Sequence, residues 1–370
     1  MNRPRLLLLI PHLGGGGAEH VTTLLAENLS GEKYEIHLGL ITQGLEGADS
    51  LAPWVIVHSL GARRVRGGAF RLLRLIWRLR PNVILSGMAH LNFLVLLLRP
   101  FFPLGTRVLV RQNGTVSSAL ASGELPIWTH LLYRVLYRRA DWVICQSEAM
   151  AHDLSVAAGI APQRLAVLPN PVDSDAIRRF IEFPWHRSPG SGPHLLAIGR
   201  LSHEKGFDLL LEALAIVKLR FPSADLTIAG GGPELSRLKS LSRDLLIDEA
   251  VCFAGRVNNP VRLFSSASIF VLSSRHEGFP NALLEAAAAG LPIVALPSSQ
   301  GVVDLLTSQR GVFLGSNIDV ESLATSILQC LETIRPGTRF QHAWLDEFEL
   351  RRAVHVYESL IDAALAGEFA

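Results

Sequence analysis

Short apolar runs recur along the whole chain and are separated by longer segments with helical spacing. In the first half the runs lie at residues 6–10, 36–41, 55–57, 83–85, 107–110, 142–145 and 165–168. In the second half they lie at 195–198, 225–228, 251–253, 269–272, 293–295 and 311–313. Largely apolar runs of this kind are typical of strands buried on both faces. Their alternation with helices predicts an α/β protein with two doubly wound parallel sheets.

The two alternations are separated by residues 184–193, which are rich in Pro, Gly and Ser and predict a linker. The length of 370 residues is typical of about two domains. We therefore expect one domain over residues 1–182 and a second over residues 183–344.

Composition narrows the class of protein. Hydrophobic residues make up 49% of the chain and charged residues 18%, which excludes a disordered protein. Cys145, Cys252 and Cys330 are isolated, so neither a disulfide framework nor a zinc site is expected, and a reducing compartment is favoured. The apolar runs at 6–10 and 91–98 are much shorter than the roughly 20 residues of a membrane-spanning helix.

The segment 276–285 reads HEGFPNALLE and holds two carboxylates, Glu277 and Glu285. Pro280 and Gly290 are a start and a stop signal, which predict a helix over residues 281–289. Glu277 then lies at the mouth of the helix, where backbone N–H groups attract anions. An anion site flanked by carboxylates suits a ligand with both phosphates and hydroxyls, such as a nucleotide-sugar. Taken alone, the spacing also fits ordinary compensation of the helix dipole.

A second polar segment supports the ligand interpretation. Arg200 follows the apolar run 195–198, and Lys205 precedes a helical pattern over 207–219. Arg200 is thus expected at the carboxyl end of a strand, where open α/β sheets bind ligands. Arg and Lys at this position can meet a diphosphate, although Lys205 alone would be read as a solvated surface cation.

A glycine run, residues 14–17, follows the first predicted strand. It lacks the full Gly-x-Gly-x-x-Gly spacing of a dinucleotide-binding loop because position 19 is Glu. Glu46 and Asp49 are also poorly placed to bind a nicotinamide ribose. A dehydrogenase is therefore disfavoured.

These segments together resemble glycosyltransferase family 4, the retaining enzymes of the GT-B fold. The resemblance extends over nearly the whole chain. It also includes GGGGAEH at 14–20, QSEAM at 146–150, LPNPVD at 168–173, AGGGPE at 229–234 and FAGRV at 253–257. It implies two Rossmann-like domains with a cleft between them, and a last helix, 345–370, that completes the first domain. The bacterial enzymes of lipid-linked and surface polysaccharides are the most similar subgroup.

The resemblance also implies roles for individual residues. Arg200 and Lys205 would neutralise the departing diphosphate, Glu277 would bind a hydroxyl of the donor sugar, and Glu285 would bind the ribose. Further donor contacts are implied at Gly15, Gly16, Gly17, Arg256, Phe279, Asn281 and Ala282. A departing phosphate oxygen can take the acceptor's proton, so we expect no protein base, no metal and no cofactor.

One departure from the family pattern concerns the first domain. Many members carry a His after a first-domain strand, but here residues 107–110 are followed by Arg111-Gln112-Asn113. Arg111 or Asn113 is a candidate for that position, and His90 is another.

Charge is distributed unevenly along the chain. Residues 1–180 hold 19 Lys and Arg against 12 Asp and Glu, or +7, while the remainder holds 16 against 21, or −5. Arg71, Arg74 and Arg78 fall on one helical face, opposed by apolar residues at 70, 73, 76 and 77. Basic amphipathic helices lie on anionic membranes, although a helix that covers a sheet shows the same pattern. Because the resemblance implies a lipid-linked acceptor, we expect a cytoplasmic protein at the inner face of the cell membrane.

The expected function is retaining transfer of a sugar from a UDP-sugar to a glycan or polyprenyl-linked acceptor in cell-surface polysaccharide synthesis. The net charge of +2 and the lack of a recognisable binding module argue against nucleic acid as a partner. Asp173 and Asp175 could suggest a metal site, but a helix N-cap is the preferred interpretation. The alternatives are a nucleotide-sugar epimerase of the same fold and a non-catalytic nucleotide-sugar-binding protein.

Overall fold

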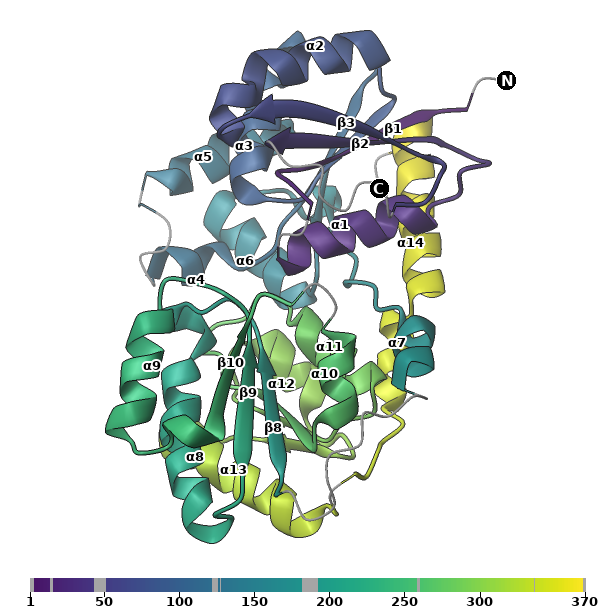
Figure 1. Cartoon of the computed structure of the whole chain (residues 1–370). Coiled ribbons are helices and arrows are strands. Elements are labelled where there is room, and N and C mark those ends of the chain that lie inside the picture. Colours follow the sequence, from purple (N-terminus) through teal and green to yellow (C-terminus); the bar gives the residue numbers. More distant parts are fainter. Residues whose placement is uncertain are drawn as a thin grey trace. The chain divides into compact units, whose positions relative to one another are not determined.

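The computed structural model describes residues 3–13, 16–42, 51–121, 126, 128–181, 192–257, 260–335 and 337–368. The chain divides into two compact units, one formed by Met1–Pro171 with Leu350–Ala370 and the other by Val172–Glu349 (Figure 1). Each unit contains a parallel sheet with helices around it, which confirms the predicted fold class. Most of the predicted linker lies outside the described residues.

Within the described residues, the sheet of the first unit has seven parallel strands in the order β3-β2-β1-β4-β5-β6-β7. They are β1 (Arg5–Ile10), β2 (Glu35–Thr42), β3 (Val55–Ala62), β4 (Val83–Ser86), β5 (Arg107–Arg111), β6 (Trp142–Cys145) and β7 (Leu165–Val167). Along β1, Leu7 and Leu9 belong to one core cluster, while Leu6, Leu8 and Ile10 belong to another. Both faces of the strand are buried, which is why its sequence is apolar without alternation.

Helices contribute residues to both core clusters of the first unit. One core contains residues of α2 (Ala69–Leu79), α3 (Ala89–Leu98), α5 (Thr129–Leu136) and α6 (Glu148–Ala158). The other contains residues of α1 (Gly17–Asn28) and α14 (Leu350–Ala366), which pack beside one another (Figure 1). The shorter helical segments are α4 (Val116–Ala121), η2 (Val65–Gly68), η3 (Arg99–Phe101), η4 (Tyr137–Arg139) and η5 (Pro162–Arg164).

The part of the second unit that the structure describes contains a sheet of six parallel strands in the order β10-β9-β8-β11-β12-β13. They are β8 (His194–Ile198), β9 (Asp225–Ala229), β10 (Val251–Gly255), β11 (Ile269–Leu272), β12 (Ile293–Ala295) and β13 (Val312–Leu314). Every strand predicted from the apolar runs is present, with bounds that differ by only a few residues.

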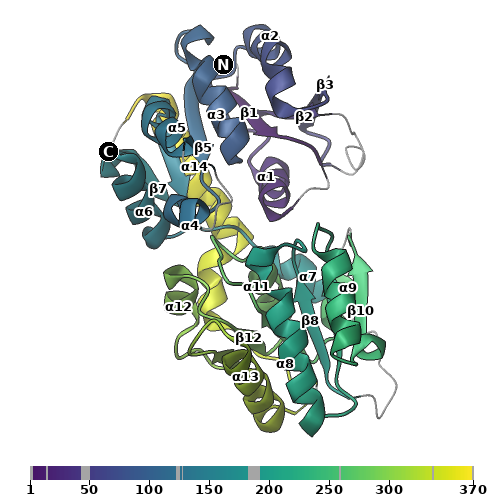
Figure 2. The same ribbon diagram turned by 90° about the vertical axis from the view of Figure 1, so that its left-hand side faces the viewer.

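Two groups of helices cover the second sheet. One core contains residues of α8 (Phe207–Arg220), α9 (Leu235–Asp244) and α13 (Val320–Thr333), and α8 packs against α13 (Figure 2). The other contains residues of α7 (Ser174–Ile181), α10 (Val261–Ser266), α11 (Asn281–Ala288) and α12 (Gln300–Leu306). The 3-10 segments are η6 (His203–Lys205), η7 (Asp248–Ala250) and η8 (Ala343–Phe348).

The division between the units differs from the predicted boundaries at 182 and 344. Helix α7 was expected in the first domain, but its Ile177 is buried in a core cluster of the second unit, and the helix contacts α10 and α11. Segment η8 belongs to the second unit as well, because Leu345 and Phe348 are buried in the same cluster. The N-cap interpretation of Asp173 is confirmed, since its Oδ1 accepts a hydrogen bond of 2.9 Å from the backbone N–H of Ala176.

Helix α2 covers the first sheet, and its apolar face differs from the predicted one. Leu72, Leu75 and Ile76 are buried, whereas Phe70 and Trp77 remain exposed. The spacing of the arginines by three and four residues therefore identified an amphipathic helix. Ile76 of the predicted apolar surface does pack on the sheet, but Phe70 and Trp77 do not. Arg71 is also bound locally, because its Nη1 donates to the backbone carbonyls of residues 60 and 61 at 2.7 Å each.

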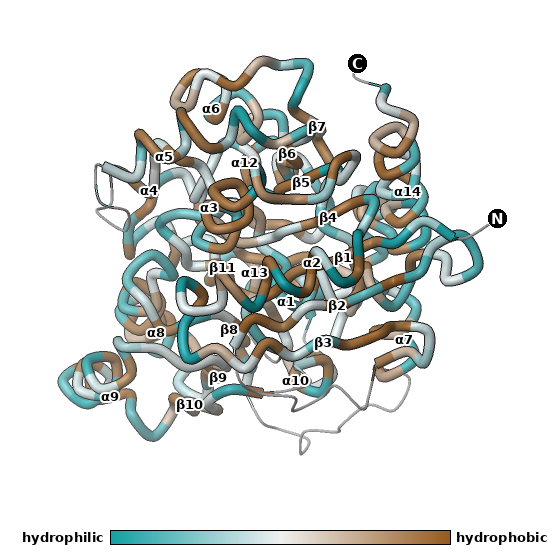
Figure 3. The backbone as a smooth tube through the Cα atoms, turned by 90° about the horizontal axis from the view of Figure 1, so that it is seen from above, coloured by the Kyte–Doolittle hydropathy of each residue, from teal (hydrophilic) through white to brown (hydrophobic). Residues whose placement is uncertain are grey.

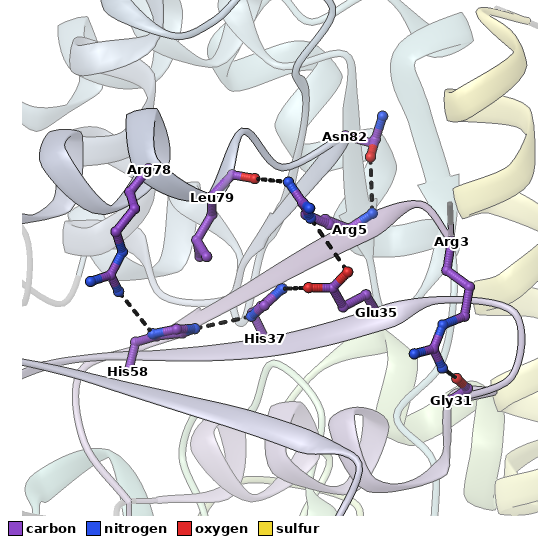
Figure 4. A network of polar contacts seen from close by, with 9 residues as sticks. All are labelled: Arg3, Arg5, Gly31, Glu35, His37, His58, Arg78, Leu79 and Asn82. Carbon is purple, nitrogen blue, oxygen red and sulfur yellow. Dashed lines mark hydrogen bonds and ion pairs between the residues drawn. The ribbon is translucent and has the colours of Figure 1, made fainter. Parts of the chain in front are cut away.

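A polar network under α2 accounts for a second arginine of the predicted basic face (Figure 4). Arg78 Nη2 donates to His58 Nδ1 at 3.4 Å, and His58 Nε2 lies 3.0 Å from His37 Nδ1. His37 Nε2 lies 3.0 Å from Glu35 Oε1, and Arg5 contacts the same carboxylate. Burial, with the neighbouring charges of His37 and Arg78, lowers the pKa of His58 to about 4. His58 is therefore neutral near pH 7, and the network ties α2 to the edge of the sheet.

Hydropathy is highest along buried segments. Helix α3 is hydrophobic over most of its length (Figure 3), and its Leu91, Val95 and Leu96 are buried in the core. Within the described part of the chain, no helix combines the length and the apolar character that crossing a membrane would require.

Helix α14 should be essential for the stability of the first unit. Ile361 is 2% exposed in its core, so Ile361→Ala should lower the free energy of unfolding by about 2–4 kcal/mol. Val356, on the same helix, is 41% exposed, and Val356→Ala should change it by less than about 1 kcal/mol. Calorimetric unfolding of both variants measures the difference, and equal effects would contradict the assignment of α14 to this core.

Candidate active site in the second unit

The candidate site lies at the carboxyl ends of β8 and β11, which are neighbours at the centre of the sheet. From β8 the chain continues to β9 on one side, and from β11 to β12 on the other, so the strand order reverses here. Such switch points are where open α/β sheets bind ligands. Arg200 and Lys205 follow β8, and Glu277 follows β11, as the sequence predicted.

Lys205 and Glu277 form an ion pair across the two loops. Lys205 Nζ lies 2.6 Å from Glu277 Oε1, and Ser274 Oγ donates to the same oxygen at 2.5 Å. The Glu277 side chain is 5% exposed and that of Lys205 25%. A carboxylate this buried requires partners, and Lys205 and Ser274 provide them. The sequence had identified both charged residues but had not paired them.

The backbones of the same two loops are also joined. Ser273 Oγ donates to the carbonyl of Lys205 at 2.9 Å, and the N–H of Arg275 donates to the carbonyl of Glu204 at 2.7 Å. Gly206 has φ +61°, and a Cβ there would lie 2.1 Å from the carbonyl oxygen of Ser273. Only glycine permits this conformation and this close approach. The position of Lys205 is thus fixed from both sides.

Arg275 forms a brace between the loop after β11 and the first turn of α8. Its Nη1 and Nη2 donate to Asp208 Oδ1 and Oδ2 at 2.7 and 3.0 Å, a bidentate pair. Burial would raise the pKa of Asp208, but the hydrogen bonds from Arg275 and Arg237 outweigh it and lower that pKa. The pairing of Arg275 with Asp208 was not predicted from the sequence. Its only signal was an acidic residue in the first turn of α8 and a cation two positions before Glu277.

The loop that carries Arg200 packs against the glycine-rich loop after β9. A Cβ on Gly230 would lie 1.8 Å from the carbonyl oxygen of Gly199, and one on Gly232 would lie 2.3 Å from that of Leu201. The N–H of Leu201 also donates to the carbonyl of Gly231 at 3.0 Å. Arg200 itself is exposed at the tip of this pair of loops. Its guanidinium is therefore accessible to a ligand.

Arg256 directly follows β10, the strand that pairs with β9. Gly255 has φ +68°, and its carbonyl accepts a hydrogen bond of 2.7 Å from the N–H of Gly230. The exposed side chain of Arg256 lies over Gly231, where a Cβ would be 3.2 Å from its Cγ. The structure thus brings Arg256 beside the loop that supports Arg200.

Helix α11 begins directly after Phe279 and Pro280, as predicted. Phe279 packs on Phe348 with ring centroids 5.5 Å apart, which anchors the start of the helix. The N-terminus, with Asn281 and Ala282 in the first turn, provides a positive dipole end for anions. Glu285 lies one turn further along, and burial raises its pKa to about 7.

The candidate residues of the first unit lie near the carboxyl ends of its strands. Gly16 caps α1, its N–H donating to Glu19 Oε2 at 3.0 Å, and Gly17 is the first helical residue. Gly15 lies outside the described residues. His90 is exposed near the start of α3, after β4.

The two candidates after β5 have partners within the first unit. Arg111, the last residue of β5, is 1% exposed, and its Nη2 donates to Asn170 Oδ1. Asn113 donates through Nδ2 to the carbonyl of Gly87 and accepts a hydrogen bond of 3.0 Å from Gln146 Nε2. Both residues therefore hold the carboxyl edge of this sheet together. Across the described ranges, no group of three or more His, Cys, Asp or Glu side chains could hold a metal ion.

The raised pKa of Glu285 has a measurable consequence. Between its ordinary value of 4.5 and about 7, the folded state keeps a proton that the unfolded chain releases, so stability falls as pH rises through this window. Glu285→Gln lacks this group. The free energy of unfolding of this variant minus that of the unsubstituted protein should therefore increase as pH rises through this window, by on the order of 2–3 kcal/mol. Denaturant unfolding from acidic to neutral pH measures this, and a difference independent of pH would contradict it.

Two family matches together span most of the chain. Residues 15–176 match the family described as Glycosyltransferase Family 4, and residues 179–340 match the family described as Glycosyl transferases group 1. The first match covers strands β2 to β7 of the first sheet and helices α1 to α6, and the second contains Arg200, Lys205, Glu277 and Glu285.

Individual proteins are similar over different lengths. The chain is 25% identical over 360 residues to an N-acetylgalactosamine-N,N'-diacetylbacillosaminyl-diphospho-undecaprenol 4-alpha-N-acetylgalactosaminyltransferase of Campylobacter jejuni, covering 94% of each chain. It is 36% identical over 133 residues to an uncharacterized glycosyltransferase of Haemophilus influenzae, but this covers only 36% of the chain and 38% of that relative.

A solved structure supports the fold. HepE of Anabaena, in complex with UDP and glucose, has a TM-score of 0.79 at 18% identity, covering 97% of this chain and 99% of HepE. At this identity the likeness shows the two-domain GT-B fold alone. Because the two family matches cover both halves and the architecture agrees, the chain belongs to glycosyltransferase family 4.

Proposed function

We propose that the protein is a retaining glycosyltransferase that moves a sugar from a UDP-sugar to a glycan or lipid-linked acceptor of a cell-surface polysaccharide. The observation that carries the proposal is the Lys205–Glu277 ion pair at the carboxyl ends of β8 and β11. The pair holds the partly exposed ammonium of Lys205 at the strand ends where open α/β sheets bind ligands. The exposed Arg200 lies on the same loop after β8.

The diphosphate is the group these residues suit. Arg200 offers a forked guanidinium and Lys205 a compact charge, and the N-terminus of α11 adds the positive end of a helix dipole. As the bond from the sugar to the diphosphate breaks, negative charge grows on the phosphate oxygen. Donors already fixed in place stabilise that charge without reorganisation. The close packing around Gly206 and the Arg275–Asp208 brace provides such fixed donors.

Glu277 is proposed to act in two ways. One carboxylate oxygen holds Lys205 and Ser274, which orients the ammonium. The other oxygen accepts a hydrogen bond from a hydroxyl of the donor sugar. In the retaining reaction, the acceptor oxygen bonds to the anomeric carbon on the face that the diphosphate leaves. The departing phosphate oxygen takes the acceptor's proton, so neither a protein base nor a metal is needed.

The nucleoside would also be bound at the carboxyl ends of the strands of the second sheet. Glu285, once ionised, accepts hydrogen bonds from the ribose hydroxyls, and the backbone near Arg256 meets the base. The glycine run at 15–17 is proposed to admit the diphosphate by close backbone approach. A UDP-sugar is favoured because HepE, which has the same fold, is in complex with UDP and glucose.

The acceptor is proposed to be lipid-linked. The name of the Campylobacter jejuni relative describes a diphospho-undecaprenol substrate. His90 and Asn113, at the carboxyl edge of the first sheet, are the proposed sugar or acceptor contacts. Arg111 is buried, so we propose that it positions this edge by binding Asn170. Peripheral association with the inner face of the cell membrane follows as part of the proposal.

UDP should raise the melting temperature of the protein without added metal, because the two cations and the helix mouth supply the counter-charge of the diphosphate. Thermal-shift measurements with UDP, GDP and ADP, each with and without EDTA, check this. A shift with GDP or ADP alone, or loss of the UDP shift in EDTA, would contradict the proposed donor or the metal-independent mechanism.

Substitution of the two cations should reduce turnover. The exposed Arg200 can be replaced without loss of stability, whereas Lys205→Ala leaves the buried Glu277 with Ser274 and should also lower the free energy of unfolding. Arg200→Ala and Lys205→Ala should each lower kcat by about 10²–10³, because each removes a donor from the charge that develops on the phosphate. Glu285→Ala should chiefly weaken UDP binding. Arg220→Ala, which removes an exposed cation from the end of α8, is the matched control and should retain full turnover.

Turnover is measured as sugar transfer from a UDP-sugar to an acceptor extract. Near-normal rates in both cation variants would exclude this site as the centre of catalysis. Release of an epimerised sugar without an acceptor would instead identify a nucleotide-sugar epimerase.

A further inference from the structure

The first unit contains a cavity of its own, near the amino ends of strands β5, β6 and β7. This cavity of about 490 Å³ is lined by Arg99, Arg138, Arg139 and Arg164, together with Asp141 and two small neighbours. Arg99 lies in η3, Arg138 and Arg139 in η4, and Arg164 in η5. These turns precede β5, β6 and β7, whereas His90, Arg111 and Asn113 lie near the opposite, carboxyl edge.

One buried carboxylate organises the floor of this cavity. Asp141 is 7% exposed, and its Oδ2 accepts hydrogen bonds from Arg99 Nη2 at 2.6 Å and from the N–H of Val108 at 2.7 Å. Arg107 Nη1 lies 3.7 Å from its Oδ1. The single acidic residue of the cavity is therefore engaged by Arg99 and by the strand beneath it.

The other three arginines keep their charge available. Arg138, Arg139 and Arg164 are exposed, and no carboxylate in the described part of the chain pairs with them. Arg164 Nη1 donates to the carbonyl of Arg138 at 2.5 Å, and Arg139 Nη1 reaches the carbonyl of Leu96 at 3.4 Å. These contacts hold the guanidinium groups of Arg139 and Arg164 at the cavity without neutralising them. Several forked cations around a concave site are the arrangement that binds phosphate.

An exposed apolar rim lies on and around η3, the segment that contributes Arg99 to the cavity. It consists of Trp77, Leu97, Phe101 and Leu104, all of which are at least half exposed. Trp77 Nε1 donates to the carbonyl of Phe101 at 2.9 Å, which joins the end of α2 to η3. Arg99, in the cavity wall, lies between Leu97 and Phe101 in the sequence. Large apolar side chains gathered beside basic ones are typical of surfaces that enter the lipid–water interface.

We propose that this cavity binds the phosphate of an anionic phospholipid headgroup, while the apolar rim enters the interface beside it. The rim favours a lipid over free phosphate, because a soluble anion would gain nothing from it. The inference rests on the proposed membrane location but not on the transfer chemistry. It assigns membrane binding to this cavity rather than to the basic face of α2, whose Arg71 and Arg78 are bound to their own sheet.

The test is sedimentation with vesicles of phosphatidylcholine that contain 30% phosphatidylglycerol. An interfacial cation contributes roughly fivefold in partitioning at low ionic strength. Arg138→Gln with Arg139→Gln should therefore weaken binding by about thirtyfold. The matched control is Arg243→Gln with Arg310→Gln, which removes two exposed cations from the second unit and should change binding by less than about threefold. Leu104→Ser should weaken binding to vesicles with and without phosphatidylglycerol.

Equal losses in the two arginine pairs would show that only net charge matters and would overturn the cavity assignment. Unchanged vesicle binding in the Arg138/Arg139 variant, with loss of a thermal shift caused by inorganic phosphate, would reassign the cavity to a soluble anion. Sugar transfer to a detergent-dispersed acceptor should be the same in this variant as in the unsubstituted protein. Absence of transfer in both would refute the proposed function while leaving the vesicle result intact.

Discussion

The candidate site depends on a buried carboxylate that has to be satisfied. Glu277 is almost fully enclosed, and a charge in that position is tolerated only with close partners. Lys205 and Ser274 are those partners, and they come from two different loops. Meeting this requirement brings the loops after β8 and β11 together. The cation that would face a diphosphate is consequently held by the same contact that satisfies the carboxylate.

Glycine makes that approach possible. At Gly206, Gly230 and Gly232, an added Cβ would lie between 1.8 and 2.3 Å from a backbone carbonyl oxygen of the facing loop. The loops after β8, β9 and β11 therefore touch through backbone atoms, which have far less freedom than side chains. Because electrostatic catalysis works best with donors that need no rearrangement, this packing connects the glycine content of the loops to the proposed chemistry.

Much of the fold could be predicted because parallel strands buried on both faces leave a simple trace in the sequence. The runs at 6–10 and 195–198 are apolar at every position, and both became central strands. The pairing of Lys205 with Glu277 could not be predicted, since the two residues are far apart in the sequence and meet only because β8 neighbours β11. Likewise, periodicity showed that α2 is amphipathic, but which stripe faces the sheet depends on tertiary packing.

The side of the first sheet at which the strands end, its carboxyl edge, differs from the side at which they begin, its amino edge. This difference bears on membrane association. At the carboxyl edge, Arg111 and Asn113 are bound to polar groups of their own unit. At the amino edge, three arginines remain uncompensated around a cavity. Attachment through the amino edge would leave the carboxyl edge uncovered. An enzyme that works on a membrane-borne acceptor gains from this separation, because binding the surface then does not compete with binding the acceptor.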